Sequence, residues 1–396
     1  MRRPRHPLVP LVAALGATVL TACGGANSLG GGGSDAAGST DDTSPIPVGL
    51  LVPTSGVYAP LGEDLRQGFE LYLEQHDGQL AGRKVELQVV DEGETPDTGV
   101  PGAQRLIQQD VAAVVGIVNS ATALGVRDAF EEAQIPLVIA NAGADAITGE
   151  RSSDYVWRTS FANGEVAAAL GPYAAEKCKS VFLMAADYAA GKEAAGGFEK
   201  SFTQAGGKVA GSVFPPFGTT TNYQPFLAQV KQSGADCVYS FFAGAEAVAF
   251  TKQYAQFGLK DKVKLYSSGF LTEGGVLQAA GEAATGVETS LHYTDQLDTP
   301  RNKEFVEAYR AKYDEAPTVY AVQAYDAAQV LDQAFANGTE GPDVVAGLQA
   351  IDTVDSPRGE FGFSAGHGPD QTYYLRRVEA GQGGLVNMVV DELPAS

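Results

Sequence analysis

Short apolar runs alternate with amphipathic stretches along most of this chain. The first pair begins with Val48–Val52, an apolar run typical of a strand buried on both faces. Pro53 ends the run, and the small polar residues Thr54–Tyr58 predict a loop. Apolar residues then recur at helical spacing, which predicts a helix from Gly62 onward. A strand, loop and helix form a βα unit, and open parallel sheets bind small ligands at the carboxyl ends of their strands. Taken alone, this stretch is equally typical of any α/β protein.

The same alternation continues to about residue 160 and predicts one complete sheet. The predicted strands are Val48–Val52, Arg83–Asp91, Val111–Val118, Ile135–Ala140 and Tyr155–Thr159. Two of them are followed by small polar loops, Asn119–Thr122 and Asn141–Asp145. Ser120 is a natural N-cap for the helix expected after the first of these loops.

A second series of strands and helices then begins. Its predicted strands are Ser180–Ala185, Lys208–Val213, Asp236–Phe241, Val263–Ser267 and Gly286–Leu291. The loops after three of them are Asp187–Gly191, Phe242–Ala245 and Ser268–Phe270. The remaining chain has helical periodicity followed by three short strand patterns, so it completes the two earlier units and adds no third unit.

We therefore expect an α/β fold of two doubly wound parallel-sheet lobes joined by a three-segment hinge. The expected lobes are residues 46–160 plus 293–371 and residues 161–292 plus 372–393. The chain would cross between them near residues 159–163, 289–293 and 371–374. Such a hinge allows two lobes to close on a ligand.

The N-terminus has the pattern of a secretion signal. Arg2, Arg3 and Arg5 precede the apolar stretch Leu8–Leu20, which is too short for a settled transmembrane span. Leu20-Thr21-Ala22-Cys23 resembles a bacterial lipobox, which implies cleavage before Cys23 and lipidation of its thiol. Residues 1–22 would then be a lipoprotein signal peptide and residues 23–45 a flexible, glycine-rich tether. The alternative is an ordinary secretion signal with an unrelated cysteine.

Composition and motifs argue against two classes of function, nucleic-acid binding and catalysis. The 396 residues carry 27 Lys and Arg against 48 Asp and Glu, a net charge of −21, which argues against nucleic acid as a partner. None of the four histidines has a metal-ligand spacing, and no nucleophile with a neighbouring base is evident. We therefore expect no catalytic residue, metal or cofactor, and a secreted hydrolase is a minor alternative.

Several short motifs point to a family by their order and spacing. They are Val48-Gly49, Ser55-Gly56, Leu61-Gly62, Val115-Gly116 with Ser120, Asp187-Tyr188 with Gly191, and Tyr320–Asp326. In this order they resemble the type I periplasmic solute-binding proteins, most closely the branched-chain amino-acid binding group of ABC importers. The resemblance implies an extracytoplasmic monomer that is anchored to the membrane only by lipid. It also implies a small-molecule solute and an ABC permease and ATPase as partners. A ligand-sensing receptor domain is the alternative role.

The resemblance also implies residues that bind the solute. Ser120 matches a serine that binds the ligand carboxylate, and Ala142 matches a residue that binds through its backbone. Aromatic residues at the strand ends of both lobes could hold the apolar body of a solute, although each could instead pack at the hinge or the facing lobe. The full set of expected site residues is Ser55, Tyr58, Asn119, Ser120, Asn141, Ala142, Gly143, Tyr188, Phe242 and Phe270.

Three positions depart from the amino-acid binders. Gly143 stands where threonine is frequent, Ala190 where tyrosine is frequent, and Gly269 where we would expect the acid that pairs with the ligand ammonium. We therefore expect a small carboxylate with an apolar or aromatic body, with a branched-chain amino acid as the second possibility.

Two cysteines remain if Cys23 carries lipid. In the sheet order of the family, the strands near Cys178 and Cys237 are adjacent and parallel, and an exported protein lies in an oxidising compartment. We expect a Cys178–Cys237 disulfide, with two separate buried thiols as the alternative.

Overall fold

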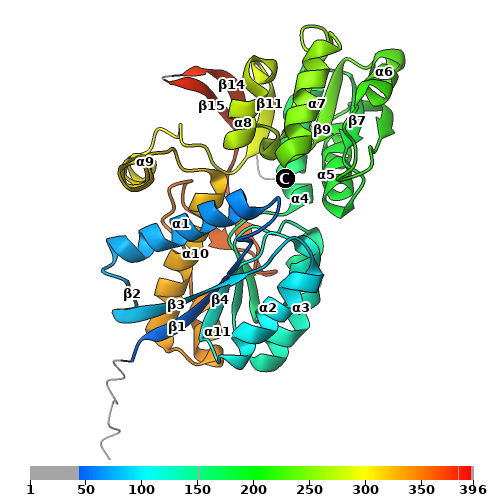
Figure 1. The fold of residues 1–396 in the computed structure, drawn as a ribbon. Coiled ribbons are helices and arrows are strands. Elements are labelled where there is room, and N and C mark those ends of the chain that lie inside the picture. The colour runs from blue at the N-terminus through cyan, green and yellow to red at the C-terminus, as the bar shows by residue number, and fades with distance from the viewer. Residues whose placement is uncertain (1–43, 150–151, 382, 394–396) are drawn as a thin grey trace, which may run out of the picture. The chain divides into compact units, whose positions relative to one another are not determined.

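Two α/β lobes, each built on its own sheet, make up the part of the chain that the computed structural model describes, residues 44–149, 152–381 and 383–393 (Figure 1). The predicted signal peptide, Cys23 and most of the predicted tether lie outside the described residues. The first sheet has the strand order β2-β3-β1-β4-β5-β6. Its strands are β1 (Ile46–Val52), β2 (Gln79–Leu80), β3 (Arg83–Asp91), β4 (Ala113–Gly116), β5 (Leu137–Ile139) and β6 (Val156–Arg158).

The second sheet has the order β15-β14-β11-β10-β9-β7-β8. Its strands are β7 (Ser180–Ala185), β8 (Lys208–Val213), β9 (Cys237–Phe241), β10 (Lys264–Ser268), β11 (Glu288–Leu291), β14 (Tyr373–Gly381) and β15 (Gly384–Leu393). A small two-stranded sheet pairs β12 (Gly362–Phe363) with β13 (Pro369–Asp370).

The predicted two-lobe α/β fold is confirmed, but neither large sheet is wholly parallel. β2 pairs with β3, and β14 pairs with both β11 and β15, in antiparallel directions. Tight connections join β2 to β3 and β14 to β15, and a tight hairpin can connect only antiparallel strands. The other strand pairs of both large sheets are parallel, as expected for doubly wound lobes.

Helices cover both sheets (Figure 1). The first lobe carries α1 (Ala59–Gln75), α2 (Pro96–Gln108) and α3 (Ser120–Ala133), and the second carries α4 (Asn163–Lys177), α5 (Ala189–Gln204), α6 (Gln224–Ser233), α7 (Gly244–Gln256) and α8 (Gly275–Ala280). Three more follow β11: α9 (Pro300–Tyr313), α10 (Val319–Ala334) and α11 (Gly341–Gln349). Short 3₁₀ turns are η1 (Asp145–Ile147), η2 (Gly269–Thr272), η3 (Gly281–Ala284) and η4 (Phe335–Asn337).

The first helix begins earlier than the sequence predicted. α1 begins at Ala59, before the predicted start at Gly62. α2 begins at Pro96, and a proline suits this place because in the first turn it lacks only an N–H that the helix would leave unpaired.

The chain passes between the two sheets three times: after β6, after β11 and before β14. α10 returns to the first lobe, where Tyr325 packs edge-on against Tyr72 of α1. Gly68 of α1 allows this close approach, because a Cβ there would collide with the carbonyl of Ala321. The lobe boundaries themselves stay a prediction.

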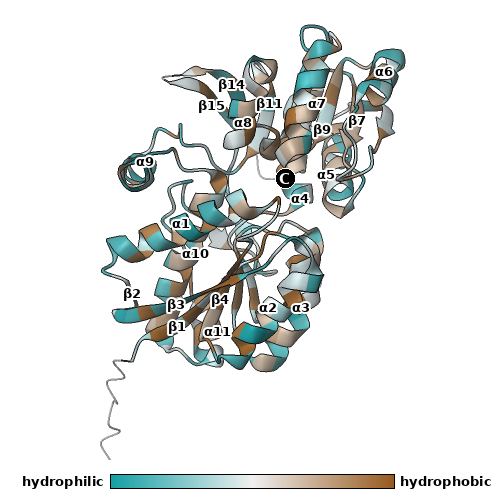
Figure 2. Ribbon diagram, in the orientation of Figure 1, coloured by the Kyte–Doolittle hydropathy of each residue, from teal (hydrophilic) through white to brown (hydrophobic). Residues whose placement is uncertain are grey.

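Strands at the centre of each lobe are buried on both faces. In β1, Val48, Leu50 and Val52 join one apolar cluster, whereas Leu51 joins another on the opposite face. This matches the prediction for the first apolar run. Figure 2 shows β1 and β4 mainly brown, in contrast to the largely hydrophilic α9.

The predicted disulfide is confirmed. Cys178 follows α4, Cys237 begins β9, and their Cα atoms are 6.2 Å apart. β7 and β9 are parallel neighbours, which brings the starts of the two strands together. Within residues 44–149, 152–381 and 383–393, no helix has the length and apolarity needed to cross a membrane.

Candidate functional site

The loop between β1 and α1 is held by Asp91 at the end of β3. Its carboxylate accepts hydrogen bonds from Thr54 N at 2.8 Å and from Ser55 Oγ at 2.7 Å. Burial alone would raise the pKa of Asp91, but hydrogen bonds from Ser55, Thr54 and Gly93 lower it to about 2. The hydroxyl of Ser55, a predicted site residue, is therefore engaged in fixing its own loop.

Asn119, not Ser120, caps α3. The Oδ1 atom of Asn119 accepts from Ala121 N at 2.9 Å and Thr122 N at 3.1 Å. The prediction that Ser120 is the N-cap is wrong, because the extended backbone of Asn119 puts its side chain over these two donors. Ser120 is the first helical residue, and its Oγ accepts from Ala144 N at 3.1 Å.

A buried carboxylate lies beneath the same loop. Glu92 accepts from Val118 N and Asn119 N, each at 2.8 Å, and burial raises its pKa to about 8. Glu92 and the Asn119 cap therefore engage the N–H groups of Val118, Asn119, Ala121 and Thr122, so none of these is left for an anionic solute. The N–H of Ser120 has no acceptor among the described residues.

The loop after β5 is tied to three different elements. Asn141 Nδ2 donates to Gln323 Oε1 of α10 at 2.9 Å, and Ala142 N donates to Ile117 O at 2.9 Å. Asn163 N donates to Gly143 O at 2.8 Å. The N–H of Ala142 is therefore engaged and is not available to the carboxylate of a solute.

Gly143 lies against the first chain crossing. A Cβ on Gly143 would lie 2.6 Å from Asn163 Oδ1 and closer still to the ring of Phe161. The sequence had singled out Gly143 but missed Phe161, whose position just after the predicted strand Tyr155–Thr159 was the available signal.

A row of aromatic rings lies along the strand ends of the second lobe. Phe217, exposed over 43% of its surface, stacks on Tyr188 with ring centroids 4.3 Å apart. The row continues to Phe241 at 6.3 Å, then to Phe270 at 6.2 Å, and ends with Phe161 at 4.7 Å. Tyr188 and Phe270 were predicted from the sequence, whereas Phe217, Phe241 and Phe161 were not.

Phe242 lies on the other face of the second sheet. It is 1% exposed and packs against Tyr223 and Phe250, with centroids 5.3 and 4.6 Å away. Because successive residues of a strand point to opposite faces, Phe241 takes the position that we expected for Phe242. The period-2 pattern of β9 could have identified this.

Tyr58 from the first lobe lies within electrostatic reach of a carboxylate of the second lobe. Burial raises the pKa of its hydroxyl, and so do the carboxylates of Glu92 and of Glu246 at the start of α7. Burial also raises the pKa of Tyr188, with Tyr58 as a further cause. The two predicted tyrosines of different lobes therefore lie within electrostatic reach of each other.

Gly269 has no room for a side chain. A Cβ there would lie 2.6 Å from Leu291 Cβ and closer still to Nη2 of Arg376. The carbonyl oxygen of Gly269 is also engaged, because Arg376 Nη2 donates to it at 3.0 Å.

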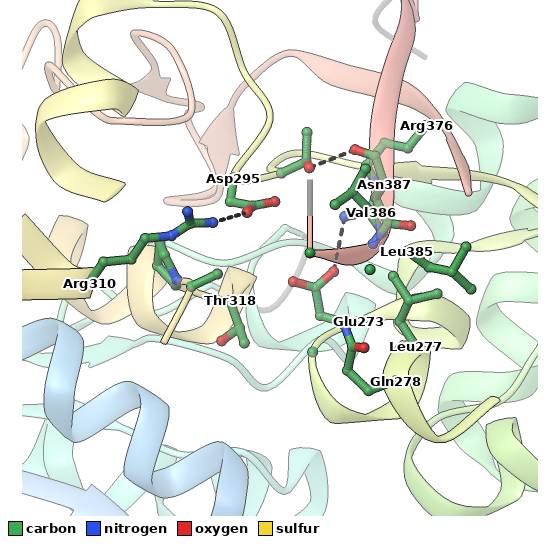
Figure 3. Close-up of a pocket in the computed structure, with 16 residues that line it drawn as sticks. Glu273, Leu277, Gln278, Asp295, Arg310, Thr318, Arg376, Leu385, Val386 and Asn387 are labelled. Atoms are coloured by element: carbon green, nitrogen blue, oxygen red, sulfur yellow. Dashed lines mark hydrogen bonds and ion pairs between the residues drawn. The ribbon is translucent and has the colours of Figure 1, made fainter. Parts of the chain in front are cut away.

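A separate pocket of about 220 Å³ lies beside α8 and β15 (Figure 3). Asp295 and Arg310 form an ion pair of 3.3 Å on one side, and the buried pair Glu273–Arg376 forms another part of the wall. None of the predicted site residues lines this pocket.

Comparison with known proteins agrees with this geometry. A family described as periplasmic binding protein matches residues 45–383. The chain belongs to the periplasmic binding protein family. Among curated relatives, this binding protein is 29% identical over 343 residues to Leu/Ile/Val-binding protein homolog 6 of Brucella melitensis, covering 84% of this chain and 87% of the relative.

Two solved structures are similar over nearly their whole length. An ABC-transporter solute-binding protein from R. palustris, in complex with benzoate, is 37% identical with a TM-score of 0.81 and covers 89% of this chain and 98% of its own. A second, from Rhodopseudomonas palustris BisB5 with 3,4-dihydroxy benzoic acid, is 30% identical with a TM-score of 0.83 and the same coverage.

These matches decide the general function. The protein is an ABC-transporter solute-binding protein that acts outside the cytoplasm, and it is not an enzyme.

Proposed function

We propose that this periplasmic binding protein captures a small carboxylate with an aromatic or apolar body for an ABC importer. The proposal rests mainly on the surroundings of Gly269. They leave no space for an acidic side chain at this position, and the carbonyl oxygen of Gly269 already accepts a hydrogen bond from Arg376. An α-ammonium group would find no partner there, and a buried unpaired charge costs several kcal/mol.

The groups near Ser120 favour an anion. Because Ser120 Oγ accepts from Ala144 N, its own proton can be donated to a solute oxygen. The N–H of Ser120 is a second donor at the start of α3, where the helix dipole also favours negative charge.

A buried cation, Arg158, contacts the loop after β5 that also bonds to Ser120. Arg158 is 2% exposed, and its Nη1 donates to Ala144 O at 2.9 Å, whereas its Nε has no partner in the described part of the chain. Burial lowers the pKa of Arg158, an effect that the nearby carboxylate of Glu165 opposes. A carboxylate bound at Ser120 would similarly offset part of the cost of burying this charge.

The aromatic row supports a flat apolar body for the solute. Tyr188, Phe241 and Phe270 could stack with or edge onto an aromatic ring at the distances seen between these residues. The similarity to binding proteins solved with benzoate and dihydroxybenzoate supports the same class.

Branched-chain amino acids are the second candidate, favoured by the Leu/Ile/Val-binding homologues at 29% identity. We further propose lipidation at Cys23, delivery by a monomer to an ABC permease and its ATPase, and anchoring to the membrane through lipid alone. A receptor that senses the same solute is the alternative role.

Titration calorimetry on the purified protein tests the solute class. Benzoate and cinnamate-type acids should bind, whereas leucine, isoleucine and valine should not. An acid present at 100 times its dissociation constant should stabilise the fold by about 2.7 kcal/mol. Micromolar binding of leucine without any response to aromatic acids would contradict the proposal.

A further inference from the structure

One buried guanidinium connects the loop after β10, which contains Gly269 and Phe270, with the hinge. Arg376 of β14 has no exposed surface. Its Nη2 donates to Gly269 O at 3.0 Å, and its Nη1 donates to Tyr293 O, in the crossing after β11, at 2.7 Å. Its Nε donates to Thr289 Oγ1 of β11 at 3.3 Å. The loop, the crossing and the sheet are thus held by a single side chain.

The same guanidinium reaches the first lobe through a carboxylate. Arg376 Nη1 pairs with Glu273 Oε2 at 2.9 Å (Figure 3). The other carboxylate oxygen, Glu273 Oε1, accepts from Val319 N at 2.8 Å. Val319 is the first residue of α10. The pair is buried with all its polar atoms engaged, so neither partner can move without breaking contacts of the other.

α10 in turn holds the loop after β5, which contains Asn141. Gln323, one turn along the helix from Val319, accepts from Asn141 Nδ2 at 2.9 Å. Hydrogen bonds therefore connect Gly269 through Arg376, Glu273 and α10 to Asn141, and none of the four that involve these side chains is longer than 3.0 Å.

We propose that Arg376 is a positioning residue that couples the Gly269 loop to the Asn141 loop and, together with Leu291, leaves no space for a side chain at position 269. The inference rests on the proposed function, in which these two loops hold the solute. Its consequence is that one residue outside the solute site sets both its shape and its selectivity against ammonium groups.

Lysine cannot replace this residue. The planar guanidinium directs several N–H groups at four acceptors in different directions, whereas an ammonium offers three donors from a single atom. Arg376→Lys keeps the charge opposite Glu273 but loses most of the remaining contacts. Arg377→Lys is the matched control, because Arg377 is next along β14 and pairs with Glu288 and Glu379 nearer the surface.

Hydrogen exchange of the ligand-free protein tests the coupling without reference to any solute. Arg376→Lys should speed amide exchange about tenfold, about 1.4 kcal/mol, in both η2 and the first turn of α10. Arg377→Lys should change neither segment. Faster exchange confined to β14 and its sheet neighbours would overturn the coupling.

Benzoate titration tests the effect on the site. Arg376→Lys should bind benzoate about tenfold more weakly, while Arg377→Lys binds like the unaltered protein. If Arg376→Lys is less stable but binds benzoate within about twofold of the unaltered protein, its role is only structural and the inference fails. If the unaltered protein binds no aromatic acid, the proposed function fails, whereas the exchange result still decides the coupling.

Should Arg376→Lys not fold, Glu273→Asp replaces it. The shorter side chain keeps the charge beside Arg376 and withdraws from Val319 N. Exchange should then rise in the first turn of α10 alone, and unchanged exchange there would overturn the link to the first lobe.

Discussion

Phe161 occupies the space that a side chain on Gly143 would need. Its ring is the nearest neighbour of a Cβ placed on Gly143, and it packs against Phe270 with centroids 4.7 Å apart. Phe161 belongs to the first crossing, and Phe270 belongs to η2, directly after β10 in the second lobe. The glycine thus makes room for an aromatic contact at the first chain crossing.

Gly143→Ala should destabilise the protein and weaken binding of benzoate. The methyl group forces Phe161 or Asn163 to move, and overpacking of this kind costs about 1–3 kcal/mol. Urea denaturation measures the loss. Gly196→Ala is the control, because a Cβ on this helical glycine of α5 meets no atom within 4 Å. Equal changes in the free energy of unfolding for the two substitutions would show that the absence of a side chain at Gly143 is not needed for the packing of Phe161.

Phe241→Leu should weaken binding of an aromatic solute, whereas Phe242→Leu should change only stability. Both rings are buried, but Phe241 is in the row with Tyr188 and Phe270, and Phe242 packs on the opposite face of the sheet. Calorimetry at a temperature where both variants are folded separates affinity from stability. A loss of affinity in Phe242→Leu alone would reverse the assignment.

These two residues illustrate what the sequence could and could not predict. Apolar runs identified the strands and the two lobes, because burial on both faces leaves a strong local pattern. The Cys178–Cys237 pair followed from the sheet order of the resembling family. The face of the sheet that Phe241 takes was readable from period 2, yet we assigned the loop residue beside it.

Other features depend on contacts between distant segments. Glu92 sits in a polar stretch of ordinary appearance, and only the structure brings its carboxylate to Val118 N and Asn119 N. Arg376 is likewise one arginine beside another in the sequence, although only Arg376 is fully buried. Local pattern carries no information about such pairings.

Asp64 should make stability depend on pH. Burial raises its pKa to about 7, although Thr318 Oγ1 donates to it at 2.7 Å, and the carboxylates of Glu315, Glu273 and Glu63 raise it further. An unfolded aspartate has a pKa of about 3.9, so the folded state binds more protons between these values. Its contribution is therefore fully present below pH 4 and is lost as the pH rises to about 7.

Asp64→Asn should flatten this profile. The amide oxygen can still accept from Thr318, and no charge has to be buried above pH 7. Urea denaturation between pH 4.5 and pH 8 should show the variant gaining stability over the unaltered protein as the pH rises, with about 1.4 kcal/mol for each unit of pKa difference as an upper bound. Asp261→Asn, at an exposed position, should give no such trend. A constant difference at all pH values would contradict the prediction.

Cys23→Ser should release the protein from the membrane fraction. The motivation is the lipobox resemblance of Leu20–Cys23 after an apolar stretch, since a thioether-linked lipid requires the cysteine sulfur. Fractionation of cells followed by immunoblotting measures the distribution. Retention of the variant in the membrane to the same degree would mean that Cys23 is not the anchor.

Substitutions of Ser120 and Asn119 should distinguish solute binding from helix capping. Ser120→Ala removes a donor from the proposed carboxylate site while Asn119 continues to cap α3 through Ala121 N and Thr122 N. Hydrogen bonds to charged groups are worth about 1.5–3 kcal/mol, so benzoate affinity should fall about ten- to hundredfold.

Asn119→Ala should instead lower the unfolding free energy by about 1 kcal/mol, the usual value of a cap, with a smaller change in affinity. Denaturation and calorimetry on both variants give the two quantities independently. Unchanged affinity in Ser120→Ala, together with a cap-sized loss of stability, would return Ser120 to a purely structural role and leave the anion site without its main donor.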